Sequence, residues 1–308
     1  MKLLITGATG MVGKNLTENT GINRYEVLTP SSSELNLLDF AATKAYVTEK
    51  APDMIIHCAG KVGGIQANMA EPVDFLVQNL DMGRNIIMAA KETGVKKLIN
   101  MSSSCMYPRN AQNPLKEELV LKGELEPTNE GYALAKIAAM KLCEYIARED
   151  ESFQYKTLIP CNLYGRWDKF DPKHSHMLPA VIKKIHEAKV NNSDVVEIWG
   201  DGTARREFMY AGDLADFVAK AINNFDEVPA LINVGLGHDY TINEYYEAIA
   251  KVIGFEGKFV HDLSKPVGMK QKLIDDNRLK QFGWNYTTSL EDGIRKTYEF
   301  YLENKQHD

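Results

Sequence analysis

Short apolar runs alternate with amphipathic stretches along the first half of the chain. "KLLIT" (2–6) and "DMIIHCAG" (53–60) are bounded by polar or glycine-containing segments, which is typical of buried strands. "FAATKAYVTEK" (40–50) instead repeats apolar residues at helical spacing. Strands are expected at 2–6, 25–29, 53–60, 96–102 and 155–160, and helices at 11–20, 40–50, 79–94 and 129–150.

This alternation of strands and helices indicates a parallel α/β sheet with right-handed crossovers. After about residue 166 it breaks down, and helices are expected near 211–224, 241–253 and 289–302. We therefore predict a Rossmann-type doubly wound parallel sheet over 1–166 and a smaller substrate-binding α/β domain over 167–308. The chain is expected to cross back between the two. Ligands of such sheets bind at the carboxyl ends of the strands.

Composition narrows the class of protein. A net charge of −6 gives no electrostatic reason to bind nucleic acid or an anionic membrane, and neither partner is expected. The first apolar run is too short for an export signal, and no window reaches membrane-spanning length. The four cysteines are widely spaced and form no CxxC motif. We expect a cytoplasmic protein without a disulfide framework or a metal site.

The motif "GATGMVG" places Gly7, Gly10 and Gly13 between the first strand and the first helix. Its GxxGxxG spacing differs from the usual GxGxxG fingerprint of dinucleotide sites, but it meets the same physical needs. These are a tight turn, close backbone approach to a pyrophosphate, and a helix N-terminus facing it. The motif predicts a dinucleotide cofactor, the alternative being a turn without a ligand.

The second strand leads into "LTPSSSE" (28–34), which has no acidic residue at the strand end, where an NAD site usually carries one. Glu34 lies further along. Asp39 either reaches the adenine or caps the helix at 40–50, and the sequence leaves both roles open.

Tyr132 and Lys136 are four residues apart in the helix expected at 129–150, so their side chains share one face. A lysine ammonium near a tyrosine hydroxyl lowers the pKa of the phenol, which makes Tyr132 a candidate general acid for a substrate carbonyl. Ser103, at the end of the strand at 96–102, can donate a second hydrogen bond to the same oxygen.

Together, the glycine turn, Ser103, Tyr132 and Lys136 resemble the extended short-chain dehydrogenase/reductase family. Blocks such as "AKVGGIQAN", "SSSCMYP", "SHMLPA" and "REFMY" are similar to one branch of it, the GDP-L-fucose synthases. The resemblance implies a homodimeric enzyme that uses NADP(H). It would invert C3 and C5 of GDP-4-keto-6-deoxy-D-mannose and then reduce the C4 ketone, giving GDP-L-fucose.

The resemblance assigns Cys105 and His176 as the acid/base pair for inversion. Protons on C3 and C5 are acidic because they flank the ketone, and thiol and imidazole both titrate close to neutral pH. Cys105 has an alternative interpretation as a small buried apolar residue. His176 shares its loop with His174, and either can be a plain surface histidine.

The same resemblance implies the ligand-binding residues. Cofactor contacts are expected from Gly7, Thr9, Gly10, Met11, Val12, Gly13, Leu38, Asp39, Ala59, Ser102, Tyr132, Lys136, Pro160, Asn162, Leu163 and His176. Substrate contacts are expected from Ser103, Asn162, Lys184, Trp199, Arg206, Lys272 and Asp275. The dimer is expected to form through the helices at 79–93 and from about 130, the second presenting Ile137, Met140 and Tyr145.

The sequence departs from the family pattern at the cofactor. Thr9 replaces an expected arginine, and the serines at 31–33 supply no charge for a 2′-phosphate. Lys14 or Arg24 can supply one, although both also suit a solvated surface. We expect NADP(H) with weak discrimination against NAD(H).

Other functions stay open at this stage. They are a C4-reductase or single-centre epimerase/reductase of a related GDP-4-keto-deoxysugar or heptose, a 4-epimerase with bound NAD, and a non-catalytic dinucleotide sensor.

Overall fold

The computed structural model describes residues 1–171, 175–265 and 268–304. Its main sheet is parallel throughout, with the order β10-β5-β4-β3-β1-β2 in these residues. The strands are β1 (Lys2–Thr6), β2 (Glu26–Leu28), β3 (Met54–His57), β4 (Lys97–Met101), β5 (Gln154–Pro160) and β10 (Leu231–Val234). The strand order reverses beside β1, which creates the crevice where such sheets bind ligands.

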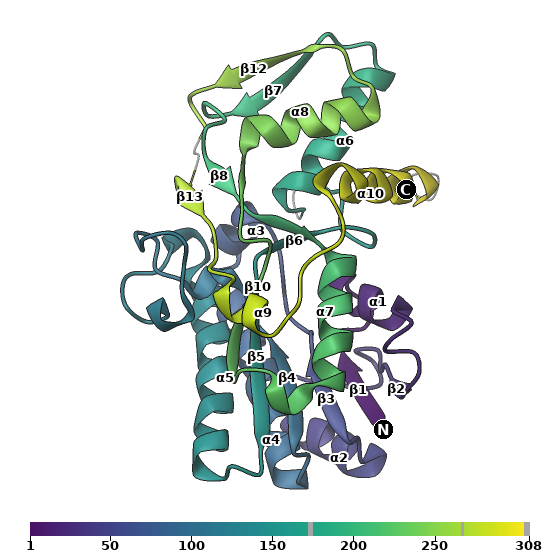
Figure 1. Cartoon of the computed structure of the whole chain (residues 1–308), viewed down its shortest axis with the longest axis vertical. Helices are drawn as coiled ribbons and strands as arrows, with labels where there is room; N and C mark the ends of the chain where they lie inside the picture. Colours follow the sequence, from purple (N-terminus) through teal and green to yellow (C-terminus); the bar gives the residue numbers. More distant parts are fainter. Residues whose placement is uncertain (172–174, 266–267, 305–308) are drawn as a thin grey trace.

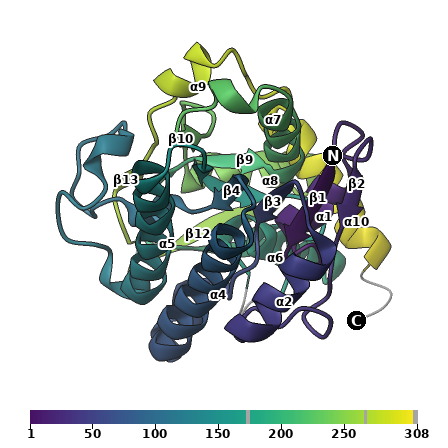
Figure 2. The same ribbon diagram turned by 90° about the horizontal axis from the view of Figure 1, so that it is seen from below.

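Helices cover both faces of this sheet because alternate strand residues point to opposite sides. Leu4 packs against one set of helices, whereas Leu3 and Ile5 pack against the other. The first set is α2 (Phe40–Lys50), α4 (Pro72–Thr93) and α5 (Glu130–Glu149), and the second is α1 (Met11–Glu18) and α7 (Ala211–Asn223). Figure 2 shows α4 and α5 side by side. The buried apolar runs of the sequence thus form the middle layer.

A smaller part lies over the carboxyl ends of the strands (Figure 1). Its helices are α6 (Met177–Val190), α8 (Ile242–Ile253) and α10 (Leu290–Asn304). Its strand sets are β7 (Val195–Trp199) with β12 (Lys258–Asp262), β6 (Asn162–Tyr164) with β9 (Phe208–Tyr210), and β11 (Tyr240–Thr241), β8 (Arg205–Arg206) and β13 (Gln271–Lys272). The remaining short helices are α3 (Ile65–Ala70), α9 (Asn277–Gln281), η1 (Ser104–Met106), η2 (Glu117–Leu119), η3 (Pro127–Asn129) and η4 (Phe225–Glu227).

The predicted fold class is confirmed, and the differences are local. α4 begins at Pro72 rather than at 79, because proline fits the first turn of a helix. α7 and β10 return to the main sheet from beyond residue 166.

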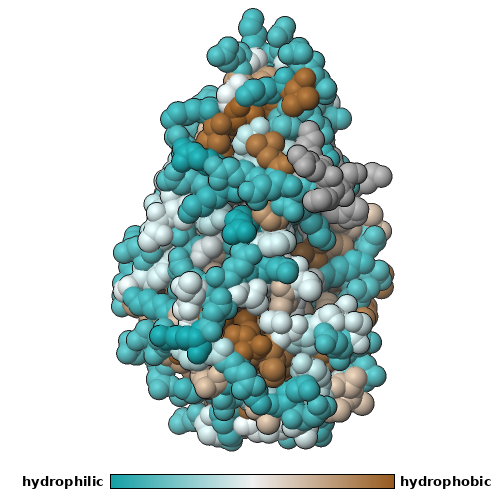
Figure 3. Space-filling view, turned by 90° about the vertical axis from the view of Figure 1, so that its right-hand side faces the viewer, coloured by the Kyte–Doolittle hydropathy of each residue, from teal (hydrophilic) through white to brown (hydrophobic). Residues whose placement is uncertain are grey.

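The surface of the molecule is mixed. Figure 3 shows one face that is largely hydrophilic, with separate hydrophobic patches. Among the described residues, none of the helices has the length and apolarity to cross a membrane. These residues also bring together no cluster of His, Cys, Asp and Glu side chains fit for a metal ion.

Candidate active site

The glycine motif forms a tight cradle between β1 and α1. Gly7 has a φ of +72°, and a Cβ added there would lie 2.6 Å from the Ala59 backbone beyond β3. A Cβ at Gly13 would lie 2.3 Å from the Gly7 carbonyl oxygen. Gly10 precedes α1 and has no side chain to cap it, so the first N–H groups of the helix are available to a ligand. The cradle fits a pyrophosphate, which only backbone atoms can approach so closely.

The other expected cofactor residues surround this cradle. Met11 and Val12 form the first turn of α1, and Thr9 is exposed beside them. Ser102, Pro160, Asn162 and Leu163 lie at or just beyond the carboxyl ends of β4 and β5. Their contacts with a cofactor stay predictions.

Asp39 caps α2, because its Oδ1 accepts a hydrogen bond from the Ala42 N–H at 3.0 Å. The capping role left open by the sequence is therefore confirmed. Leu38, just before it, is exposed. Contacts of both residues with an adenine stay predictions.

The loop after β2 contains a carboxylate held by serine. Glu34 Oε2 accepts hydrogen bonds from the Ser31 N–H and hydroxyl, both at 2.8 Å, and these bonds lower the pKa of Glu34. Ser33 Oγ lies 2.8 Å from Ser31 Oγ. The two basic residues considered for a 2′-phosphate have other contacts. Lys14 lies over the Trp167 ring, and Arg24 donates a hydrogen bond to the Tyr25 hydroxyl. This loop therefore presents a negative charge.

Tyr132 and Lys136 share one face of α5, as the spacing predicts. Lys136 Nζ donates to the Met101 carbonyl oxygen at 3.0 Å and lies 5.7 Å from the centre of the Tyr132 ring. Burial raises the pKa of Tyr132 and lowers that of Lys136. The net displacement of the Tyr132 pKa is therefore opposite in direction to the expected one, because burial dominates it. A neutral phenol nevertheless holds the proton that a general acid donates.

Cys105 lies in the 3₁₀ turn η1 directly after β4. The Ser103 side chain caps this turn by accepting a hydrogen bond from the Cys105 N–H at 3.3 Å. Burial raises the pKa of the Cys105 thiol, and nearby Lys272, Ser103 and Lys136 oppose that rise. Cys105 also acts electrostatically on Tyr132. The thiol is therefore buried among predicted catalytic side chains.

His176 directly precedes α6 and therefore belongs to the smaller part of the molecule. The residue is exposed, yet enough protein surrounds its imidazole that burial lowers the pKa of this group. Lys169 and then Lys272 lower this pKa further. Lys272 therefore acts electrostatically on both Cys105 and His176. His174, the alternative, lies outside the described residues.

Arg206 and Lys272 are direct partners in the parallel pairing of β8 with β13. Burial lowers the pKa of both side chains. An anionic ligand bound to them would stabilise their charged forms. Trp199, at the end of β7, is 46% exposed, with Lys265 Nζ 5.7 Å from its ring centre. The paired cations suit a diphosphate, and the exposed indole of Trp199 suits contact with a flat group.

Three expected substrate residues are already engaged within the chain. Lys184 Nζ donates to the Glu197 carbonyl oxygen at 2.5 Å, and burial lowers its pKa. The two Asp275 oxygens accept from the backbone and side chain of Asn277, at 3.0 and 2.9 Å. Asn162 Nδ2 donates to the Glu207 carbonyl oxygen at 3.0 Å. Their substrate contacts stay predictions.

The sequence reasoning missed Glu126 and Glu207 near the site and interpreted His57 as a structural residue. His57 is buried, its pKa lowered to about 3 by burial and then by Lys136, and it therefore stays neutral beside Thr6. Glu126 acts electrostatically on Arg206 and Lys272. Glu207 is a buried carboxylate directly after Arg206. A charged residue directly before the apolar run "FMY" (208–210) was the only local signal for Glu207.

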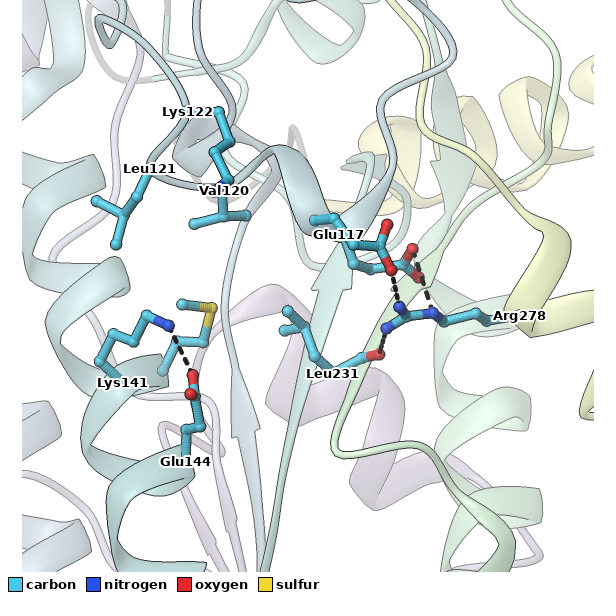
Figure 4. Close-up of a pocket in the computed structure, with 10 residues that line it drawn as sticks. Glu117, Val120, Leu121, Lys122, Lys141, Glu144, Leu231 and Arg278 are labelled. Carbon is cyan, nitrogen blue, oxygen red and sulfur yellow. Dashed lines mark hydrogen bonds and ion pairs between the residues drawn. The ribbon is translucent and has the colours of Figure 1, made fainter. Parts of the chain in front are cut away.

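A separate pocket of about 370 Å³ opens between η2, α5 and α9 (Figure 4). Arg278 pairs there with Glu117 and Glu118, and Lys141 pairs with Glu144. None of the expected site residues lines this pocket. Most of its charges are paired with one another, and it contains none of the side chains that the sequence predicts for catalysis.

The parallel sheet, the glycine cradle and the grouping of Ser103, Tyr132 and Lys136 define a dinucleotide-dependent enzyme of the short-chain dehydrogenase/reductase type. The chain belongs to the NAD dependent epimerase/dehydratase family, whose model matches residues 3–235.

Named relatives match the whole chain. A GDP-L-colitose synthase of Yersinia pseudotuberculosis is 58% identical over 100% of both chains. A GDP-L-fucose synthase of Azorhizobium caulinodans is 50% identical over 99% of this chain and 97% of its own. Among solved structures, a GDP-mannoheptose C4 reductase from Campylobacter jejuni with NADP bound is 34% identical. It has a TM-score of 0.87 and matches 98% of each chain.

Proposed function

We propose that the protein is an NADPH-dependent epimerase/4-reductase of a GDP-4-keto-6-deoxyhexose. One observation carries this proposal: Cys105 lies among Ser103, Tyr132 and Lys136, and Lys272 acts electrostatically on both Cys105 and His176. A reductase needs only the serine, tyrosine and lysine. The thiol and the imidazole supply the acid and base that inversion beside a ketone requires.

Ser103 and Tyr132 would hold the C4 oxygen of the sugar. Their hydrogen bonds stabilise negative charge on that oxygen, both when a neighbouring carbon loses its proton and when the ketone is reduced. Tyr132 gives its proton to the oxygen in the reduction. The Gly7–Gly13 cradle would hold NADPH, which would supply the hydride.

The resting protonation states suit an inversion. The raised pKa of Cys105 keeps the thiol protonated near neutral pH, and the lowered pKa of His176 keeps the imidazole neutral. The pair therefore holds one proton to give and one lone pair to receive a proton. Arg206 and Lys272 would bind the GDP diphosphate, with Trp199 beside the nucleoside.

Two products fit this chemistry. GDP-L-fucose requires inversion at both C3 and C5. GDP-L-colitose lacks the C3 hydroxyl, so only C5 is inverted. The 58% identity to a GDP-L-colitose synthase, against 50% to a GDP-L-fucose synthase, favours the second product.

Steady-state kinetics with NADPH tests the proposal. The two substrates are GDP-4-keto-6-deoxy-D-mannose and its 3-deoxy analogue, and NMR identifies each product. We expect oxidation of NADPH with at least one substrate, and a higher kcat/KM with the 3-deoxy analogue. An enzyme that oxidises NADPH with neither substrate would contradict the proposal.

A further inference from the structure

Glu207 is a buried carboxylate that the proposed chemistry does not use. It follows Arg206 at the end of β8 and is 1% exposed. Its Oε1 accepts hydrogen bonds from the backbone N–H groups of Leu236, at 2.6 Å, and Gly237, at 3.0 Å. Its Oε2 accepts one from Ile274 at 3.0 Å. One side chain thus joins the loop after β10 to the segment after β13.

β8 carries Arg206 and β13 carries Lys272, the two side chains predicted to bind the diphosphate. These short strands need such a connection. β8 and β13 pair through the registers Arg205 with Gln271 and Arg206 with Lys272. A ladder of this length is weak by itself. The facing side chains also carry like charges, and Arg206 acts to lower the pKa of Lys272. The bond from Ile274 to Glu207 continues the pairing beyond both strands.

The surroundings of Glu207 leave its carboxylate little freedom. A Cβ at Gly235 would lie 2.4 Å from Glu207 Oε1 and 2.8 Å from Ile274 Cδ1. The backbone oxygen of Glu207 accepts the hydrogen bond from Asn162, which connects it to β6. The carboxylate is therefore fixed between the main sheet and the substrate-binding strands.

On the basis of the proposed function, we propose that Glu207 is a positioning residue that holds Arg206 and Lys272 in register for the diphosphate. Glu207→Gln tests this with little change of volume. The amide oxygen can still accept from Leu236 and Gly237, but the NH₂ group faces the Ile274 N–H, donor against donor. The change therefore releases β13 selectively. Loss of such a buried hydrogen bond corresponds to about a tenfold weaker affinity for GDP.

Isothermal titration of GDP and of NADPH into the folded protein measures this effect without catalysis. Glu117→Gln is the matched control. Glu117 is also buried, and its Oε1 accepts from the Asn233 N–H of β10 at 2.9 Å, but it lines the pocket of Figure 4. We expect Glu207→Gln to weaken GDP binding about tenfold and leave NADPH binding within about twofold. Glu117→Gln should leave both affinities unchanged.

Lys272→Met separates positioning from general stability. The double variant combines Glu207→Gln with Lys272→Met. If Glu207 acts through Lys272, the double variant should bind GDP no more weakly than Lys272→Met alone, because the losses of affinity are then not additive. Additive losses, or GDP binding by Glu207→Gln as tight as by the unmodified protein, would overturn the inference. If the unmodified protein binds no GDP, the proposed function itself fails.

If Glu207→Gln does not fold, as judged by circular dichroism, Glu207→Asp replaces it in the GDP titration. Aspartate keeps the carboxyl group but is one methylene shorter, so it cannot reach both loops at once. The same loss of GDP affinity is expected, and full affinity would overturn the inference.

Discussion

Cys105 and His176 have pKa values displaced in opposite directions. Burial raises the thiol pKa above its usual 9.0, and burial with two nearby lysines lowers the imidazole pKa below its usual 6.5. Exchange of substrate C5 protons with solvent should therefore be constant between about pH 6.5 and 9. It should fall only at lower pH, where the imidazole gains a proton, and at higher pH, where the thiol loses its own. NMR exchange rates across this range check the prediction. A steady rise between pH 7 and 9 would show instead that the thiolate is the base.

Substitution of Cys105 can separate the inversion from the reduction. Cys105→Ser should slow inversion by roughly 10²–10⁴-fold, because a serine hydroxyl is a much poorer acid. Ser103, Tyr132 and Lys136 stay in place, so NADPH should still be oxidised and a reduced but unepimerised sugar should accumulate. Cys143→Ser, a buried cysteine within α5, is the control and should give the normal product. Normal product at the normal rate from Cys105→Ser would make Cys105 a structural residue.

Among the elements, the loop after β2 determines cofactor preference in this account. We predict NADPH as cofactor with only about a tenfold preference over NADH, a difference of about 1.4 kcal/mol. Serine hydroxyls bind a 2′-phosphate without charge, and the Glu34 carboxylate nearby opposes it. Glu34→Gln should increase the ratio of kcat/KM for NADPH over NADH. A preference of the unmodified protein for NADH would show that Glu34 selects the 2′-hydroxyl instead.

How far the elements could be predicted depended on the range of the interactions that form them. β1 and β3 are buried apolar runs between clear breaks, and α2 matches its expected bounds. β10 was missed because its partner β5 lies far earlier in the chain, so no local alternation marks it. β8 and β13 are too short to show any period, and only the fold pairs Arg206 with Lys272. The same limit hid Glu207, whose donors come from two distant loops.

For the whole molecule we propose a homodimer formed by α4 and α5, which lie side by side in Figure 2. The expected interface residues need correction. Ile137 and Met140 are buried in the core of the subunit, because that face of α5 packs on the sheet, whereas Tyr145 is exposed. Besides Tyr145, the exposed large apolar side chains of these two helices are Val73, Val77, Leu80 and Leu134. The first three repeat at helical spacing, so they form one stripe along α4.

Light scattering at micromolar concentration should give twice the mass of the chain. Leu80→Asp should give the mass of a single chain, because a charge then lies within the apolar contact. Leu302→Asp on α10 is the control, since Leu302 is 39% exposed and Leu80 38%. A single-chain mass for the unmodified protein would contradict the dimer.

The central claim is that one site both inverts and reduces the same GDP-4-keto-6-deoxyhexose. Incubation of the protein with the substrate and NADPH in deuterated water tests it most directly, with the product analysed by NMR. We predict an L-configured product that carries deuterium at C5, formed with one NADPH oxidised per sugar. A reduced sugar that retains its original configuration and carries no deuterium at C3 or C5 would contradict the account.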